Sequence, residues 1–142
     1  MSAEAAALQA ALAGEHAALY AYGVVGARSS GSDADLAAAA YVRHRARRDA
    51  LVAMLTEAGE RPAAPEVAYD LPFATDGRAP LRRLAALVEG RCAALYAALV
   101  QHSPAGRAFA ARGLVDCATT QLGWGGPPEP FPGLGRSTAP GT

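Results

Sequence analysis

Hydrophobic residues recur along the chain with the three- and four-residue spacing of amphipathic helices, and this pattern predicts four helices. No stretch keeps the alternation of apolar and polar residues that indicates a β-strand. Capping residues and glycines bound the four stretches, which cover approximately residues 3–28, 33–58, 78–101 and 104–122. We therefore expect an all-α protein.

The connections between these stretches predict how the helices are arranged. Short loops join the first helix to the second and the third to the fourth, so each pair is expected to form an antiparallel hairpin. The link between residues 59 and 77 is far longer than the ~2–8 residues usual in bundles. A Pro-rich link of ~18 residues reaches ~56 Å, whereas a helix of ~26 residues is ~39 Å long. This link can therefore cross the whole bundle, which would make the second and third helices parallel. The side chains expected to hold it on the surface are Tyr69, Leu71, Pro72 and Phe73.

Composition and charge narrow the class of protein. The chain has 142 residues, which suits one domain, and its basic residues are all arginine. The formal net charge is zero, which argues against a dedicated nucleic-acid binder. The N-terminal residues lack the basic region of a secretory signal, and we find no apolar run near the ~20 residues that span a bilayer. We expect a cytoplasmic protein that binds no membrane, with Cys92 and Cys117 as reduced core residues.

Polar residues interrupt the inward-facing stripes of three predicted helices near their midpoints. The inward positions of the first helix are Leu8, Leu12, Glu15, Leu19 and Tyr22. Those of the second helix are Tyr41, His44, Arg48, Leu51 and Leu55. Glu89 lies on the flank of the third stripe. We expect a core polar cluster of Glu15, His44, Arg48 and Glu89 at one level of the bundle, because a buried charge needs a partner.

Four short segments carry a resemblance to a known family. They read AGEHAALYAYG at residues 13–23, HRARRDAL at 44–51, YDLP at 69–72 and FPGL at 131–134. In this order and spacing they resemble a ferritin-like domain family of unknown function from actinobacteria, over nearly the whole chain up to Leu134. The resemblance implies a ferritin-like four-helix bundle of two antiparallel hairpins joined by a long crossover, with no established activity.

The C-terminal segment divides into two parts. Phe131 and Leu134 are expected to dock on the bundle, so that residues 1–134 form one ferritin-like domain. From residue 135 to 142 no side chain offers an anchor, and a disordered tail is expected.

The wider ferritin-like superfamily implies a diiron site, built from one Glu on each of two helices and a Glu-x-x-His motif on each of the others. Glu15 and Glu89 suit the two single positions. Glu-x-x-His occurs nowhere in this sequence, and Glu89-x-x-Cys92 has the spacing with a thiol in place of the imidazole. Most of the implied ligand set is therefore missing.

Three interpretations of the polar cluster remain open. Arg48 would bridge Glu15 and Glu89 in a structural network that replaces the metal. Alternatively, Glu15, His44 and Glu89 would hold a single iron, manganese or zinc ion. In the third interpretation, Arg48 would bind an anionic small ligand.

We favour the network, and hence a non-catalytic protein without a cofactor. The alternative is an iron- or manganese-dependent oxidoreductase with a reduced ligand set. A homodimer is plausible through an alanine-rich outer face, for which the candidates are Ala37, Ala38, Ala93 and Ala97.

Overall fold

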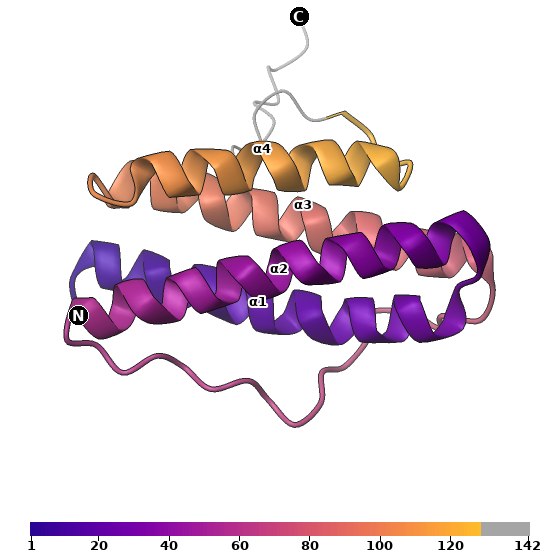
Figure 1. The fold of residues 1–142 in the computed structure, drawn as a ribbon, viewed down its shortest axis with the longest axis horizontal. Coiled ribbons are helices and arrows are strands. Elements are labelled where there is room, and N and C mark those ends of the chain that lie inside the picture. The colour runs from indigo at the N-terminus through magenta and orange to yellow at the C-terminus, as the bar shows by residue number, and fades with distance from the viewer. Residues whose placement is uncertain (129–142) are drawn as a thin grey trace, which may run out of the picture.

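The computed structural model describes residues 1–128, and within them the chain forms four helices and no strand. These are α1 (Ala3–Arg28), α2 (Gly31–Glu57), α3 (Arg78–His102) and α4 (Arg107–Gly123). They pack side by side as a bundle (Figure 1). The all-α prediction is confirmed for this part of the chain. The expected docking of Phe131 and Leu134, and the expected tail from residue 135, lie outside the described residues.

The link between α2 and α3 runs along the outside of the bundle from one end to the other, so α2 and α3 point the same way (Figure 1). Side-chain contacts agree with this direction. Asp33, near the start of α2, accepts hydrogen bonds of 2.8 Å from Arg78 Nε and 2.6 Å from Arg82 Nη1, near the start of α3. The two N-terminal ends therefore meet at one end of the bundle, as the length of the link predicted.

The first part of this crossover is hydrogen-bonded to α1. The side-chain amide of Gln9 donates to the Arg61 carbonyl over 2.7 Å and accepts from the Ala63 N–H over 3.0 Å. His16 Nε2 lies 2.9 Å from the Ala63 carbonyl oxygen and donates to it. These bonds give an otherwise extended segment a fixed course over the helix.

Aromatic and apolar side chains hold the later part of the crossover. Tyr69 packs against Tyr20 with ring centroids 5.5 Å apart. Leu71 and Phe73 pack against the core, and the Arg83 guanidinium lies 4.4 Å from the centre of the Phe73 ring. The expectation that this part is held on the bundle surface therefore agrees with the structure.

The predicted inward stripe of α1 is buried throughout, but the stripe of α2 is displaced by one residue in two places. Ala40 is buried where we predicted Tyr41, and the Arg47 side chain is 11% exposed against 30% for Arg48. The fully buried α2 residues are Asp33, Ala37, Ala40, His44, Leu51 and Leu55. At the first place the helix turns the small Ala40 inward and leaves the larger Tyr41 outside, and at the second place it exchanges one arginine for the next.

Helix α3 is long and apolar enough to cross a membrane by length and composition alone, which differs from the expectation that no apolar run approaches this length. In the bundle its inward face packs against α1 and α4 and carries the buried Glu89. A central helix of a bundle meets the same criterion, so this property gives only weak support for a membrane span.

The turn between α3 and α4 is longer than predicted. Residues 104–106 form a turn, and α4 begins at Arg107 instead of Pro104. Ser103 is buried and its Oγ accepts from the Gly106 N–H over 2.9 Å, which satisfies the last backbone donor of this turn.

Candidate functional site

A buried polar cluster lies halfway along the bundle. It contains Glu15 from α1, His44 from α2 and Glu89 from α3, each close to the midpoint of its helix. The three residues are at most 1% exposed. The structure thus brings together three of the four residues that the sequence placed in the core.

His44 connects the two carboxylates. Its Nδ1 lies 2.5 Å from Glu15 Oε2 and its Nε2 lies 2.8 Å from Glu89 Oε1. Burial alone would lower the pKa of His44, but the hydrogen bonds to Glu15 and Glu89, with their negative charges, outweigh it and raise that pKa to about 10. At neutral pH the ring is therefore an imidazolium that donates from both nitrogens.

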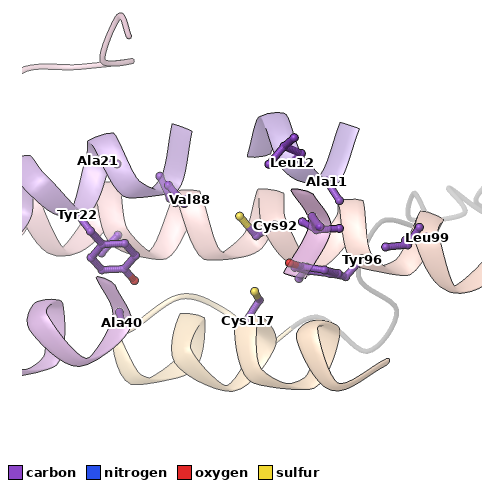
Figure 2. Close-up of a cluster of buried hydrophobic side chains, with 14 of the residues drawn as sticks. Ala11, Leu12, Ala21, Tyr22, Ala40, Val88, Cys92, Tyr96, Leu99 and Cys117 are labelled. Carbon is purple, nitrogen blue, oxygen red and sulfur yellow. The ribbon is translucent and has the colours of Figure 1, made fainter. Parts of the chain in front are cut away.

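Two tyrosines add hydrogen bonds to the carboxylates of Glu15 and Glu89. Tyr22 Oη donates to Glu89 Oε1 and Tyr96 Oη donates to Glu15 Oε1, each over 2.6 Å. Figure 2 shows the two rings reaching into the interior from opposite sides, with their hydroxyls pointing toward the middle. Burial, and then the neighbouring carboxylate charges, raise the pKa of both phenols. Both phenols therefore stay neutral and act as donors.

The arginine in this cluster is Arg47, and this corrects the prediction of Arg48. Arg47 Nε donates to Glu15 Oε1 over 2.9 Å, and its Nη1 donates to Asp116 Oδ2 over 2.5 Å. Arg48 pairs instead with its neighbour Asp49 at the surface, over 2.8 Å. The cause is the displacement of the α2 stripe, which turns residue 47 toward the core.

Arg48 lines a surface pocket of about 230 Å³ beside the crossover. The same pocket is lined by His16, Tyr20, Tyr41 and Tyr69. A site for an anionic ligand that includes Arg48 would therefore lie at this surface, away from the core cluster.

The charges inside the cluster balance. Burial would raise the pKa of Glu15, but its bond to His44 and the charges of His44 and Arg47 lower it overall. Two carboxylates thus face one imidazolium and one guanidinium. Such internal pairing is what allows charged groups to remain in a core without water.

Two thiols lie beside these charged groups. Cys92 and Cys117 are free and buried, and Figure 2 shows them within one interior cluster, on α3 and α4. The Cys92 thiol donates to the Gly14 carbonyl over 3.8 Å, and Arg47 Nη2 lies 3.6 Å from Cys117 Sγ. Interaction with Cys92, followed by burial, raises the pKa of Cys117, so this thiol stays protonated.

One polar atom in the cluster has no partner. Glu89 Oε2 is the single buried side-chain nitrogen or oxygen without a hydrogen bond among residues 1–128. An unsatisfied carboxylate oxygen in a core is costly. Of the four carboxylate oxygens of Glu15 and Glu89, it is the one that the other residues of the cluster do not bind.

Sequence reasoning missed several members of this network. The sequence predicts Tyr22 only as an inward position of the first helix, and it does not single out Tyr96 or Arg47. A signal for the tyrosines is present, because Glu15 and Glu89 are each followed by a tyrosine at the seventh residue. The sequence gives no comparable signal for the position of Arg47, because residues 37–40 are all alanine and suit more than one inward stripe of α2.

The chain is similar to proteins whose function has not been determined. Residues 7–136 match the family model described as "Domain of unknown function (DUF4439)". Among curated proteins, none matches this chain. A similar solved structure is the crystal structure of a conserved hypothetical protein, rv2844, from Mycobacterium tuberculosis. It is 36% identical, with a TM-score of 0.83 over 87% of this chain and 88% of that one. Because the family model spans nearly the whole sequence, this chain belongs to the DUF4439 family.

Proposed function

We propose that this protein is a ferritin-like four-helix protein without a catalytic role, in which His44 and Arg47 stand in place of a diiron centre. The observation that carries the proposal is the position of His44. Its two ring nitrogens reach the carboxylates of Glu15 and Glu89 over 2.5 and 2.8 Å. A cation thus lies between the two carboxylates, where a ferritin-like protein would hold metal.

The residues of the cluster do not fit a diiron centre. That centre uses four carboxylates and two histidines, whereas the described cluster offers two carboxylates and one histidine. Both His44 nitrogens and three of the four carboxylate oxygens already form hydrogen bonds, the exception being Glu89 Oε2. We therefore derive no iron chemistry from this site.

The network explains how the bundle keeps two buried carboxylates without iron. Glu15 and Glu89 would repel each other in a medium of low dielectric constant. The His44 imidazolium between the two carboxylates and the Arg47 guanidinium bound to Glu15 are the cations that offset this repulsion. Folding therefore needs no metal, and the closed network resembles a structural element more than a reaction site.

Elemental analysis tests this proposal. The protein is purified from cells grown with iron and manganese, and both metals are measured per chain. We expect both to be far below one ion per chain, and chelator treatment should leave the thermal unfolding midpoint unchanged. Nitrogen-15 NMR should show both His44 ring nitrogens protonated at neutral pH. Tightly held, stoichiometric iron or manganese would overturn the proposal in favour of the oxidoreductase alternative.

A role through association is part of the same proposal, with a cytoplasmic homodimer as the simplest form. The alanine-rich face predicted from the sequence cannot form the dimer interface as a whole, because Ala37 and Ala93 are buried inside the chain's own core. The exposed apolar side chains of α2 and α4, such as Val42 and Val115, are the better candidates. Light scattering on the full chain measures the oligomeric state directly.

A further inference from the structure

The core cluster also brings together the kinds of donor atom that bind metal ions. One ligand atom each from Glu15, His44 and Cys92 lie within 4.8 Å of one another. All three residues are at most 2% exposed. An oxygen, a nitrogen and a sulfur donor are thus already gathered in a buried space.

We propose that this cluster binds one divalent cation of borderline softness, such as Zn²⁺ or Co²⁺, through Glu15, His44 and Cys92. Glu89, one helical turn before Cys92, lies outside this group, and its unpaired Oε2 would have to turn toward the ion to serve as a fourth ligand. The inference rests on the proposed function, because it takes the metal-free network as the resting state. It differs from a diiron site in ion number, in ligand set and in the use of a thiol.

The mixture of donors determines the class of ion. A thiolate and an imidazole select Zn²⁺ and similar ions, whereas Mg²⁺, Ca²⁺ and Mn²⁺ prefer oxygen donors. Zn²⁺ commonly takes four ligands from cysteine, histidine and carboxylate side chains. The Glu89-x-x-Cys92 spacing places two of these ligands on the same face of α3.

Binding exchanges one ion for two protons. His44 loses one proton, so that one ring nitrogen binds the ion while the other keeps its N–H on a carboxylate. Cys92 loses the second proton and becomes a thiolate. The two positive charges that enter replace the imidazolium charge and offset the new thiolate charge. The cluster is therefore neutral both before and after the exchange, which avoids an unpaired charge in the core.

The remaining hydrogen bonds would orient the ligands. Tyr96 and Arg47 both donate to Oε1 of Glu15, and Tyr22 donates to Oε1 of Glu89. Such outer contacts fix the direction of carboxylate ligands and strengthen metal binding. The structure has these contacts in place before any ion enters.

Arg47 connects the cluster to the surface of the bundle. A surface pocket of about 260 Å³ is lined by Arg47 and Asp116. The Arg47 side chain connects Asp116 at this pocket to the buried Glu15.

Cobalt titration of the full chain tests the proposal. The protein is stripped with a chelator, reduced, and titrated with Co²⁺ under nitrogen. We expect one Co²⁺ per chain, a near-ultraviolet thiolate-to-cobalt charge-transfer band, and loss of that band when Zn²⁺ is added. Calorimetry with Zn²⁺ in two buffers of different ionisation enthalpy should show two protons released per ion. Absence of the charge-transfer band in the wild-type protein would overturn the proposal.

Cys92→Ser and Cys117→Ser form a matched pair, because both cysteines are buried in the same interior. Cys92→Ser should abolish the band and weaken Zn²⁺ binding about 100-fold or more, since even outer contacts are worth 10–100-fold. Cys117→Ser should keep the band. A band that survives in Cys92→Ser would overturn the ligand assignment. Failure of Co²⁺ to bind leaves the proposed function intact, because that function is tested separately by the iron and manganese content.

Discussion

Tyr22 and Tyr96 form reciprocal hydrogen bonds between α1 and α3. Each stands at the seventh residue after the glutamate of its own helix, and each donates to the glutamate of the other helix over 2.6 Å. The two antiparallel helices thus carry the same Glu-x₆-Tyr arrangement, related by a local two-fold relation around His44. This reciprocity holds the carboxylates of Glu15 and Glu89 at a fixed separation across the core.

The first prediction concerns these phenols. Tyr96→Phe should lower the free energy of unfolding by about 1.5–3 kcal/mol, because a buried carboxylate loses a donor. Tyr22→Phe should lower the free energy of unfolding by at least the same amount, since it also removes the hydroxyl that accepts from Trp124 Nε1 over 2.9 Å. Urea unfolding followed by circular dichroism measures both values.

Tyr41→Phe is the matched control, because Tyr41 is 39% exposed and removal of its hydroxyl should change little. Equal effects of the three substitutions would contradict the role of Tyr22 and Tyr96 in the network.

The second prediction separates two adjacent arginines. Arg47→Met should destabilise the protein by about 3–5 kcal/mol, because Glu15 loses a buried partner. Arg48→Met should stay within about 0.5 kcal/mol, as expected at a surface position. The same chemical change at neighbouring residues thus tests the orientation of α2. A larger loss at Arg48 than at Arg47 would show that the helix presents the other face.

A double substitution measures the coupling between Glu15 and Arg47. Glu15→Gln combined with Arg47→Met should lose less stability than the sum of the single changes, because the pair interacts directly. Additive losses would place the two residues in independent environments. Chemical denaturation of the four proteins of the cycle provides the data.

The arrangement of the helices could be predicted from the sequence because it depends on features that are local or nearly so. The spacing of apolar residues determined the helices of the described region, and the length of the link determined that α2 and α3 run parallel. The orientation of α2 could not be predicted as well, because Ala40 and Tyr41 are both compatible with a buried position. Packing against α1 decides between them, and that packing is a property of two helices together.

The partners inside the core were harder to predict, because they come from helices that only the fold brings together. Asp116 on α4 keeps 34% of its side chain exposed, yet it accepts from Arg47 on α2 over 2.5 Å. Tyr96 lies 81 residues after Glu15, to which it donates. A single sequence contains the spacing of Glu89 and Tyr96, but not the direction in which each side chain crosses the bundle.

The third prediction concerns the pH dependence of stability. The bond from Arg78, with the charge of Arg82, lowers the pKa of Asp33 in the folded protein despite the opposing effect of desolvation. A lowered carboxyl pKa contributes stability above the pKa of the unfolded chain, near 3.9, and this stability is lost as pH falls below that value. The stability difference between wild type and Asp33→Asn should therefore shrink from pH 6 toward pH 3. Urea unfolding at each pH measures it.

Asp35→Asn serves as the control, because Asp35 lies on the same helix and is exposed. Its difference from wild type should show no comparable change across this range. A pH-independent difference for Asp33→Asn would contradict the pairing with Arg78 and Arg82 at the end of the bundle.

The last prediction concerns the crossover. Gln9 binds it with both ends of its amide, accepting from the Ala63 N–H and donating to the Arg61 carbonyl. Gln9→Ala removes both bonds from an exposed site, so the Ala63 amide should exchange with solvent at least ~5-fold faster, as for the loss of ~1 kcal/mol of protection. Hydrogen exchange followed by NMR measures this rate.

The global free energy of unfolding should change little in Gln9→Ala, because the core is untouched. Gln101→Ala, an exposed glutamine near the end of α3, should leave Ala63 exchange unaltered. An unchanged Ala63 rate in Gln9→Ala would mean that His16 and the aromatic contacts alone hold the crossover in place.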